Sequence, residues 1–147
     1  MKIRTDFVTN SSSSCYVTII LQTKGKEKLS GFFDGDDVGP SCTSLTEYKP
    51  DESTINHILQ AETGKEIIQA IDDMYEGLFS NNGGIDDLFD ENQEKAETIN
   101  RSQIKNIMIK EELSTDEGSG KASLTVNFQS GKIQYKTSRL SDEDEEE

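Results

Sequence analysis

The chain has 147 residues and a formal net charge of −14, with 31% hydrophobic and 30% charged residues. This length predicts a single domain with a modest core, and no stretch approaches the ~20 apolar residues of a transmembrane helix. The excess of carboxylates disfavours direct binding to nucleic acid, because affinity for phosphates comes from clustered Lys and Arg.

The negative charge is concentrated in the middle of the chain and at its end. Residues 29–97 carry seventeen acidic and three basic side chains, and the tail SDEDEEE (residues 141–147) adds six carboxylates. The segments 1–28 and 98–140 each carry a basic excess. We expect residues 1–140 to form one domain and the tail to be a disordered, solvated end.

The two cysteines indicate a reducing compartment. Cys15 and Cys42 form no CxxC motif, and two isolated thiols fit a reducing compartment better than a disulfide scaffold. Lys2 and Arg4 are followed by Asp6 and a run of serines, where a signal peptide would have its apolar stretch. We therefore expect a cytoplasmic protein with two free thiols.

The first predicted elements form a β-hairpin. Residues 15–21 are β-branched, aromatic and apolar on both faces, which predicts a central strand. Residues 22–28 predict a turn around Gly25, and residues 29–33 are suited to the returning strand. The following residues lack periodicity, which predicts a mobile loop near residues 34–50.

The next segment predicts a first helix. Pro50 marks its start, and Ile55, Ile58 and Leu59 recur at spacings of three and four residues, as on one helical face. Gly64 is expected to interrupt this helix.

A second helix is predicted to begin at a capping box. In this motif the Thr63 hydroxyl and the Glu66 carboxylate each accept from the other residue's backbone N–H. The apolar stripe of this helix is formed by Ile67, Ile71, Met74 and Leu78. The stretch SNNGG at residues 80–84 ends the helix, and a weaker pattern over residues 86–97 suggests a third.

The last third of the chain predicts a β-meander. Its apolar residues alternate with polar ones, at Leu124, Val126, Phe128, Ile133 and Tyr135. A two-residue turn at Ser130-Gly131 would pair Phe128 with Ile133. The same turn would pair Val126 with Tyr135 on the same face.

Together with a strand over residues 103–113, these patterns predict an α+β fold. An antiparallel sheet would combine the N-terminal strand or hairpin with the C-terminal meander. Two or three helices would pack on one face of that sheet.

The stretch DGDDVG resembles the start of a calcium loop, but later ligand positions hold Val38 and Leu45, which offer no side-chain oxygen. A solvated acidic loop is favoured over weak divalent-ion binding by Asp34, Asp36 and Asp37. No zinc-type ligand set is evident, and no cofactor is expected.

Nucleophilic catalysis would require Cys15 or a serine together with a base. The only histidine, His57, falls off the apolar stripe of the first helix, which predicts a surface position. A Cys15–His57 pair is conceivable only through the tertiary fold. Cys15 as a small, buried core residue is favoured.

The acidic helices suggest a surface that binds a basic protein, as immunity proteins and inhibitors of nucleic-acid enzymes present carboxylates in place of phosphates. This comparison is an analogy on charge. The residues predicted for this surface are Asp72, Asp73, Glu76, Asp86, Asp87 and Asp90. Two alternatives stay open: a small hydrolase using Cys15 or an Asp-bound divalent metal, and an acidic surface that only keeps the protein soluble.

The four serines at residues 11–14 favour a loop, because their hydroxyls compete for nearby backbone groups. A backbone pocket for an anion, a modification site and a turn into the strand are all compatible with them.

The N-terminal sequence KIRTDFVTNSSSSCYV resembles the opening of many uncharacterised bacterial and phage proteins. The matching positions are Lys2, Phe7, Val8, Thr9, Asn10, Ser11 to Ser14, Tyr16 and Val17. The sequence departs at Cys15, where that pattern continues the serines, and at Tyr16, where Phe is more common. The resemblance covers residues 2–17 and implies a bacterial or phage origin, with no particular activity.

Overall fold

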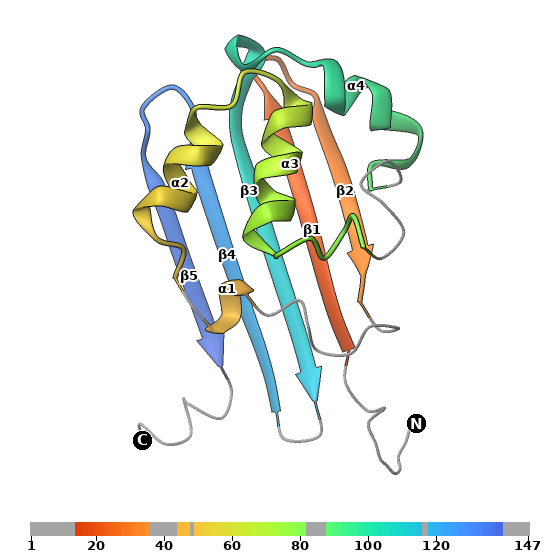
Figure 1. Ribbon diagram of the computed structural model, residues 1–147, viewed down its shortest axis with the longest axis vertical. Coiled ribbons are helices and arrows are strands. Elements are labelled where there is room, and N and C mark those ends of the chain that lie inside the picture. Colours follow the sequence, from red (N-terminus) through yellow and green to blue (C-terminus); the bar gives the residue numbers. More distant parts are fainter. Residues whose placement is uncertain (1–13, 36–43, 48, 82–87, 116–117, 140–147) are drawn as a thin grey trace.

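The computed structural model describes residues 14–35, 44–47, 49–81, 88–115 and 118–139. They form a five-stranded antiparallel sheet in the order β2-β1-β3-β4-β5, with the helices on one face (Figure 1). The strands are β1 (Ser14–Thr23), β2 (Lys28–Asp34), β3 (Ile104–Thr115), β4 (Gly118–Asn127) and β5 (Ile133–Arg139). The helices are α1 (Ser44–Glu47), α2 (Glu52–Leu59), α3 (Gly64–Met74) and α4 (Gln93–Thr98), with the 3-10 turns η4 (Asp90–Asn92) and η5 (Arg101–Gln103). The predicted α+β fold, with an N-terminal hairpin and a C-terminal meander, is confirmed.

Side-chain alternation along the strands creates the buried face of the sheet. In β1 the buried positions are Cys15, Val17, Ile19 and Leu21, each at most 1% exposed. Their partners on the neighbouring strand β3 are Leu113, Glu111, Ile109 and Ile107. Directly opposed residues in an antiparallel pair share one face, so this apolar layer includes a glutamate.

Helices α2 and α3 begin where the sequence predicts, with one difference in capping, but α3 ends at Met74, before the predicted end at residues 80–84, and α4 begins only at Gln93. Asp51 caps α2 by accepting from Thr54 N at 2.8 Å, and the Thr63 hydroxyl accepts from Glu66 N at 3.3 Å. The Glu66 carboxylate accepts from the N–H of Glu62, at 2.9 Å, and not from that of Thr63. The reciprocal half of the predicted capping box is therefore shifted by one residue.

The core between α3 and the sheet is formed mainly by isoleucines. Ile67, Ile68 and Ile71 of α3 are fully buried against the apolar layer of the sheet. Burial of each such side chain contributes about 1.5–3 kcal/mol. These contacts place α3 over the middle of the sheet, and they leave its opposite side facing outward (Figure 1).

The expected mobile loop near residues 34–50 contains the helix α1, so this prediction is wrong for residues 44–47. Leu45 and Thr46 are buried, and their backbone is held by Glu111. The remainder of that loop at residues 36–43 and 48, and the predicted disordered tail at residues 141–147, lie outside the described residues.

The C-terminal hairpin forms, but its register differs from the prediction by two residues. Val126 pairs with Ile133, and Leu124 pairs with Tyr135. The Asn127 side chain accepts from the N–H groups of Gln129 and Ser130, and Gly131, at φ +75°, donates to the Asn127 carbonyl.

This Asn127-centred loop takes the place of a two-residue turn at residues 130–131. Phe128 therefore leaves β4, donates its N–H to Lys105 O and lies beneath the Arg101 guanidinium. A shift of two residues preserves the alternation, so the predicted faces of β4 and β5 are correct.

Candidate functional site

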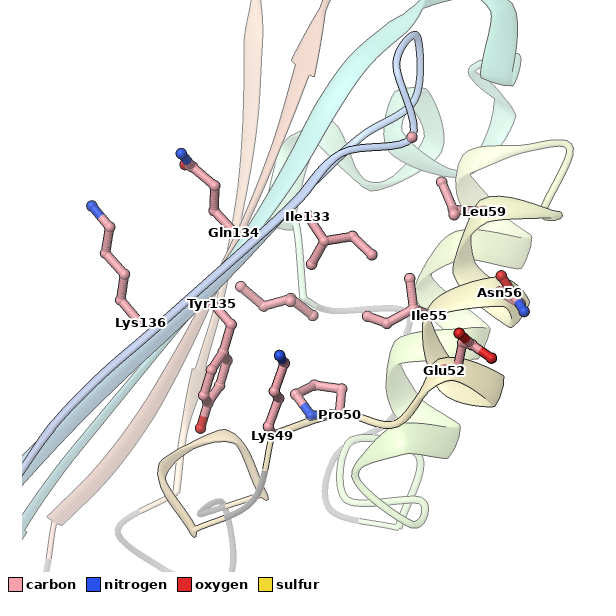
Figure 2. A pocket seen from close by; sticks show the side chains of 12 residues that line it. Lys49, Pro50, Glu52, Ile55, Asn56, Leu59, Ile133, Gln134, Tyr135 and Lys136 are labelled. Carbon is pink, nitrogen blue, oxygen red and sulfur yellow. The ribbon is translucent and has the colours of Figure 1, made fainter.

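A groove of about 770 Å³ lies between α2 and the edge strand β5 (Figure 2). Its volume is within the ~300–1,000 Å³ typical of ligand sites. Twelve residues line it: Lys49, Pro50, Glu52, Ile55, Asn56, Leu59, Leu124, Gly131, Ile133, Gln134, Tyr135 and Lys136. We call this feature the α2–β5 groove.

The floor of the α2–β5 groove is apolar. Ile55 and Leu59 extend from α2 toward Ile133 and Tyr135 of β5 (Figure 2), and Leu124 of β4, the partner of Tyr135, also lines the floor. Ile133 is 41% exposed, and only one other large apolar side chain of the described residues, Phe32, is classed as exposed. Helix α2 therefore leaves part of the apolar surface of β5 uncovered.

The rim of the groove is polar and carries two lysines and one carboxylate. Lys49 and Lys136 flank it, and Glu52 is the single carboxylate among its lining residues. Neither lysine forms an ion pair with a residue that the structure describes. Both lysines are exposed.

A buried carboxylate holds the lower end of the groove in place. Glu111 is fully buried, and its two oxygens accept from Leu45 N at 2.9 Å and from Thr46 N and Oγ1 at 2.7 and 2.5 Å. The Tyr75 hydroxyl donates to the same carboxylate at 2.6 Å. We call these four hydrogen bonds the Glu111 clamp, which fixes α1 to the centre of the sheet.

The clamp reaches the groove through α1. The Tyr135 hydroxyl donates to the Leu45 carbonyl oxygen, and Lys49 and Pro50 follow shortly after α1 along the chain. Burial and the adjacent Glu111 carboxylate raise the pKa of Tyr75 well above its ordinary value. Tyr75 therefore keeps its proton and donates to Glu111 at neutral pH, while the Tyr135 hydrogen bond ties β5 to α1.

The predicted acidic partner surface is only partly present. Asp72 is 1% exposed and accepts from the N–H groups of Phe79 and Ser80 at 2.8 and 3.2 Å. It therefore supports the turn after α3, and its placement on an exposed surface is wrong. Asp86 and Asp87 lie outside the described residues.

The other predicted carboxylates are exposed but divide between two places. Asp73 and Glu76 lie at the C-terminal end of α3, while Asp90 lies on η4, which contacts β2. Glu62, just before α3, and Glu66, in its first turn, are also exposed. The sequence interpretation missed them, although Glu66 precedes Asp73 by two helical turns and therefore lies on the same side of the helix. We call the carboxylates Glu62, Glu66, Asp73 and Glu76 the α3 acidic face.

A hollow of about 360 Å³ lies between α2 and the α3 acidic face. It is lined by His57, Gln60, Ala61, Glu66, Gln69, Ala70 and Asp73. Glu66 and Asp73 supply its negative charge, and two alanines supply a small apolar surface. This arrangement can receive a long side chain that is apolar along its stem and cationic at its tip.

The candidate catalytic groups are not assembled. Cys15 is disulfide-bonded and fully buried, so the expected free thiol at this position is wrong, and the thiol version of the hydrolase alternative is removed. Cys42 is the only other cysteine and lies outside the described residues. His57 is exposed on α2, as the sequence predicts.

The metal candidates gain no support from the part of the chain that the structure describes. Asp34 ends β2 and is exposed, while Asp36 and Asp37 fall outside that part. Among the described residues, no group of three or more His, Cys, Asp and Glu side chains could hold a metal ion. No described helix is both long enough and apolar enough to cross a membrane.

The chain matches no protein family, no curated protein and no solved structure. What it does has to be inferred from the chemistry of the α3 acidic face and the α2–β5 groove.

Proposed function

We propose that this is a non-enzymatic interaction protein whose α3 acidic face binds a basic protein partner. The observation that carries this proposal is the hollow beside α3, where Glu66 and Asp73 lie next to two alanines. An Arg or Lys side chain of the partner enters the hollow. Its stem covers the alanines and its charged tip meets the carboxylates.

The carboxylates of the face keep oxygen atoms for such a contact, although one oxygen of Glu66 already accepts from the Glu62 N–H. Glu66, Asp73 and Glu76 form no ion pair with any described residue. Among the described residues, the Asp73 carboxylate accepts one hydrogen bond, a long one of 3.3 Å from the exposed side chain of Gln69. A partner cation would therefore not have to displace an existing one.

The position of these charges also costs stability. Asp73 and Glu76 lie at the C-terminal end of α3, where no basic residue occupies the last turn. The negative end of the helix macrodipole disfavours an anion there by about 0.3–1 kcal/mol. A carboxylate pair that weakens its own helix is better explained by binding than by folding or by solubility alone, because other exposed positions would serve solubility without this penalty.

A carboxylate surface repels phosphates, so the proposed partner is a protein and not a nucleic acid. Immobilised protein should retain basic proteins from the native host, identified by mass spectrometry. Raising the salt from 0.1 M to 1 M should release them, because the Debye length shrinks from ~10 Å to ~3 Å.

Charge reversal provides the sharper test. The double variant Asp73→Lys with Glu66→Lys should lose capture, while Glu94→Lys on α4 should retain it, because Glu94 is exposed away from the hollow. Circular dichroism should show native folding for both proteins. Capture that persists in the double variant and in 1 M salt would refute the α3 acidic face as the binding surface.

A further inference from the structure

The two edges of the sheet differ. At one edge the N–H of Phe32 in β2 donates to Leu88 O at 3.0 Å, and the Phe89 ring covers Gly31, at about 3.0 Å from the position of an added Cβ. Strand β2 is thus covered by the segment before η4. Strand β5 is the opposite edge, and the α2–β5 groove runs beside it (Figure 2).

The register shows which backbone groups of β5 point outward. Asn127 N donates to Lys132 O, so the even-numbered residues of β5 face β4. The N–H and C=O groups of Ile133 and Thr137 therefore point away from the sheet. They form a template to which an extended chain can add.

The side chains of β5 define the chemistry of such a chain. Ile133 and Tyr135 lie on the side of α2, whereas Gln134 and Lys136 extend from the other side of the strand (Figure 2). An added strand alternates in the same way. One set of its side chains would enter the apolar floor of the groove, and the intervening set would lie near Lys136.

From this geometry we propose that the α2–β5 groove binds an extended peptide segment of a partner protein in which apolar residues alternate with acidic ones. The segment adds to β5 as a sixth strand. Its apolar side chains fill the space between Ile55, Leu59 and Ile133, and its carboxylates, which alternate to the other side of the strand, pair with Lys136.

Charge favours this occupant over a second copy of the chain. Lys132 and Lys136 are both exposed along β5, and two such edges placed side by side would bring like charges together. Lysines on an edge strand oppose pairing between identical strands, but they attract a carboxylate-bearing strand. This site is separate from the α3 acidic face, and its ligand has the opposite charge.

The probe is a short synthetic peptide with blocked ends that alternates leucine or valine with glutamate, titrated against the full chain by fluorescence anisotropy. Saturable binding is expected. A peptide of the same composition with its apolar residues in one block should bind at least tenfold more weakly. Exchange of every glutamate for lysine should have a similar effect, because the rim is basic. Equal binding of all three peptides, or none by the alternating one at millimolar concentration, would overturn the proposal.

Backbone methylation tests strand addition directly. Two versions of the peptide carry N-methyl groups on alternate residues, so that only one set of amides is blocked in each. One version should lose binding and the other should keep it, because only alternate amides face β5. Retention by both versions would exclude a sixth strand.

Two protein variants locate the site. Lys136→Glu should weaken binding at least tenfold, and Thr137→Pro should abolish it by removing an outward N–H on an edge strand, where proline is tolerated. Lys28→Glu, an exposed lysine on β2 at the opposite edge of the sheet, is the matched control and should leave binding unchanged. An equal loss with Lys28→Glu would overturn the assignment to β5.

The acidic tail of the chain itself is the remaining competitor. Its sequence SDEDEEE has no apolar residues to fill the groove, so deletion of residues 141–147 should change the affinity for the peptide less than twofold. Binding that appears only after this deletion would overturn the proposal and identify the tail as the occupant.

Discussion

Replacement of Glu111 by alanine tests whether one buried carboxylate organises the helical layer. The substitution removes the acceptor of all four hydrogen bonds in the Glu111 clamp. The hydroxyls of Thr46 and Tyr75 can rotate toward other acceptors. The amides of Leu45 and Thr46 cannot, because they belong to the first turn of α1.

The expected loss in the free energy of unfolding follows from the buried donors that lose their acceptor. A hydrogen bond to a charged group contributes about 1.5–3 kcal/mol, and each orphaned buried amide costs about 1–3 kcal/mol. Removal of the carboxylate also relieves its own desolvation penalty. We therefore expect Glu111→Ala to lower the free energy of unfolding by about 3–5 kcal/mol, a large fraction of the ~5–15 kcal/mol of a typical domain.

Urea denaturation followed by circular dichroism measures this loss. Tyr75→Phe removes one of the four hydrogen bonds to the carboxylate and leaves the other three. The free energy of unfolding should therefore fall by about 1–3 kcal/mol. Glu112→Ala is the matched control, because its side chain is exposed on the opposite face of the same strand, and it should stay within about 0.5 kcal/mol of the wild type. A loss below about 1 kcal/mol for Glu111→Ala, or equal losses at both positions, would refute the clamp.

Three further outcomes are expected. Gly64→Ala should destabilise by about 3 kcal/mol or more, because an added Cβ would lie 1.7 Å from the Ala96 carbonyl oxygen; Gly131→Ala, in open space at φ +75°, should cost only about 1–2 kcal/mol by thermal denaturation. The raised pKa of Tyr75 predicts full stability below pH ~10 and a loss above it, because the unfolded state releases the proton first; pH-dependent unfolding of Tyr75→Phe should show a shallower loss. Asp73→Lys should raise the free energy of unfolding by about 0.3–1 kcal/mol by removing an anion from a helix C-terminus, and a lower melting temperature would contradict the macrodipole argument.

The strands and the main helices could be predicted because their signals are local. Alternation marks β4 and β5, and isoleucines at helical spacing mark α3. The register of the last hairpin could not be predicted, because it depends on the Asn127 side chain, which accepts from the backbone N–H groups of Gln129 and Ser130. A generic two-residue turn was assumed where a side chain builds a longer loop.

The burial of two carboxylates was not predicted, for a different reason. Charge favours a solvated position for Asp72, and Glu111 was not singled out from the sequence. Glu111 nevertheless shares its strand parity with Ile107 and Ile109, and Asp72 follows Ile68 by one helical turn, so the periodicity carried the correct signal. The helix α1 left no local signal, since its backbone is held from a strand 65 residues further along the chain.

The α2–β5 groove also had no signal in the sequence, because it depends on how far α2 stands from β5. The apolar residues that line it were predicted as parts of α2 and of the hairpin, and nothing local distinguishes a side chain in a groove from one in a core. The hollow beside α3 is similar. Glu66 and Asp73 could be placed on one helix, but His57 and Gln60 of α2 complete the site only through tertiary packing.

The pairing of β1 with both β2 and β3 has a consequence for how the chain folds during synthesis. The hairpin partner β2 follows β1 within a few residues, whereas Glu111 of β3, the partner of Val17, is made more than ninety residues later. Closure of so long a loop is slow relative to local pairing. On the ribosome the residues of the first hairpin and of the helices are therefore already synthesised while one edge of β1 is still unpaired. Neither α1 nor the wall of the groove that it supports can reach its final position until Glu111 has emerged.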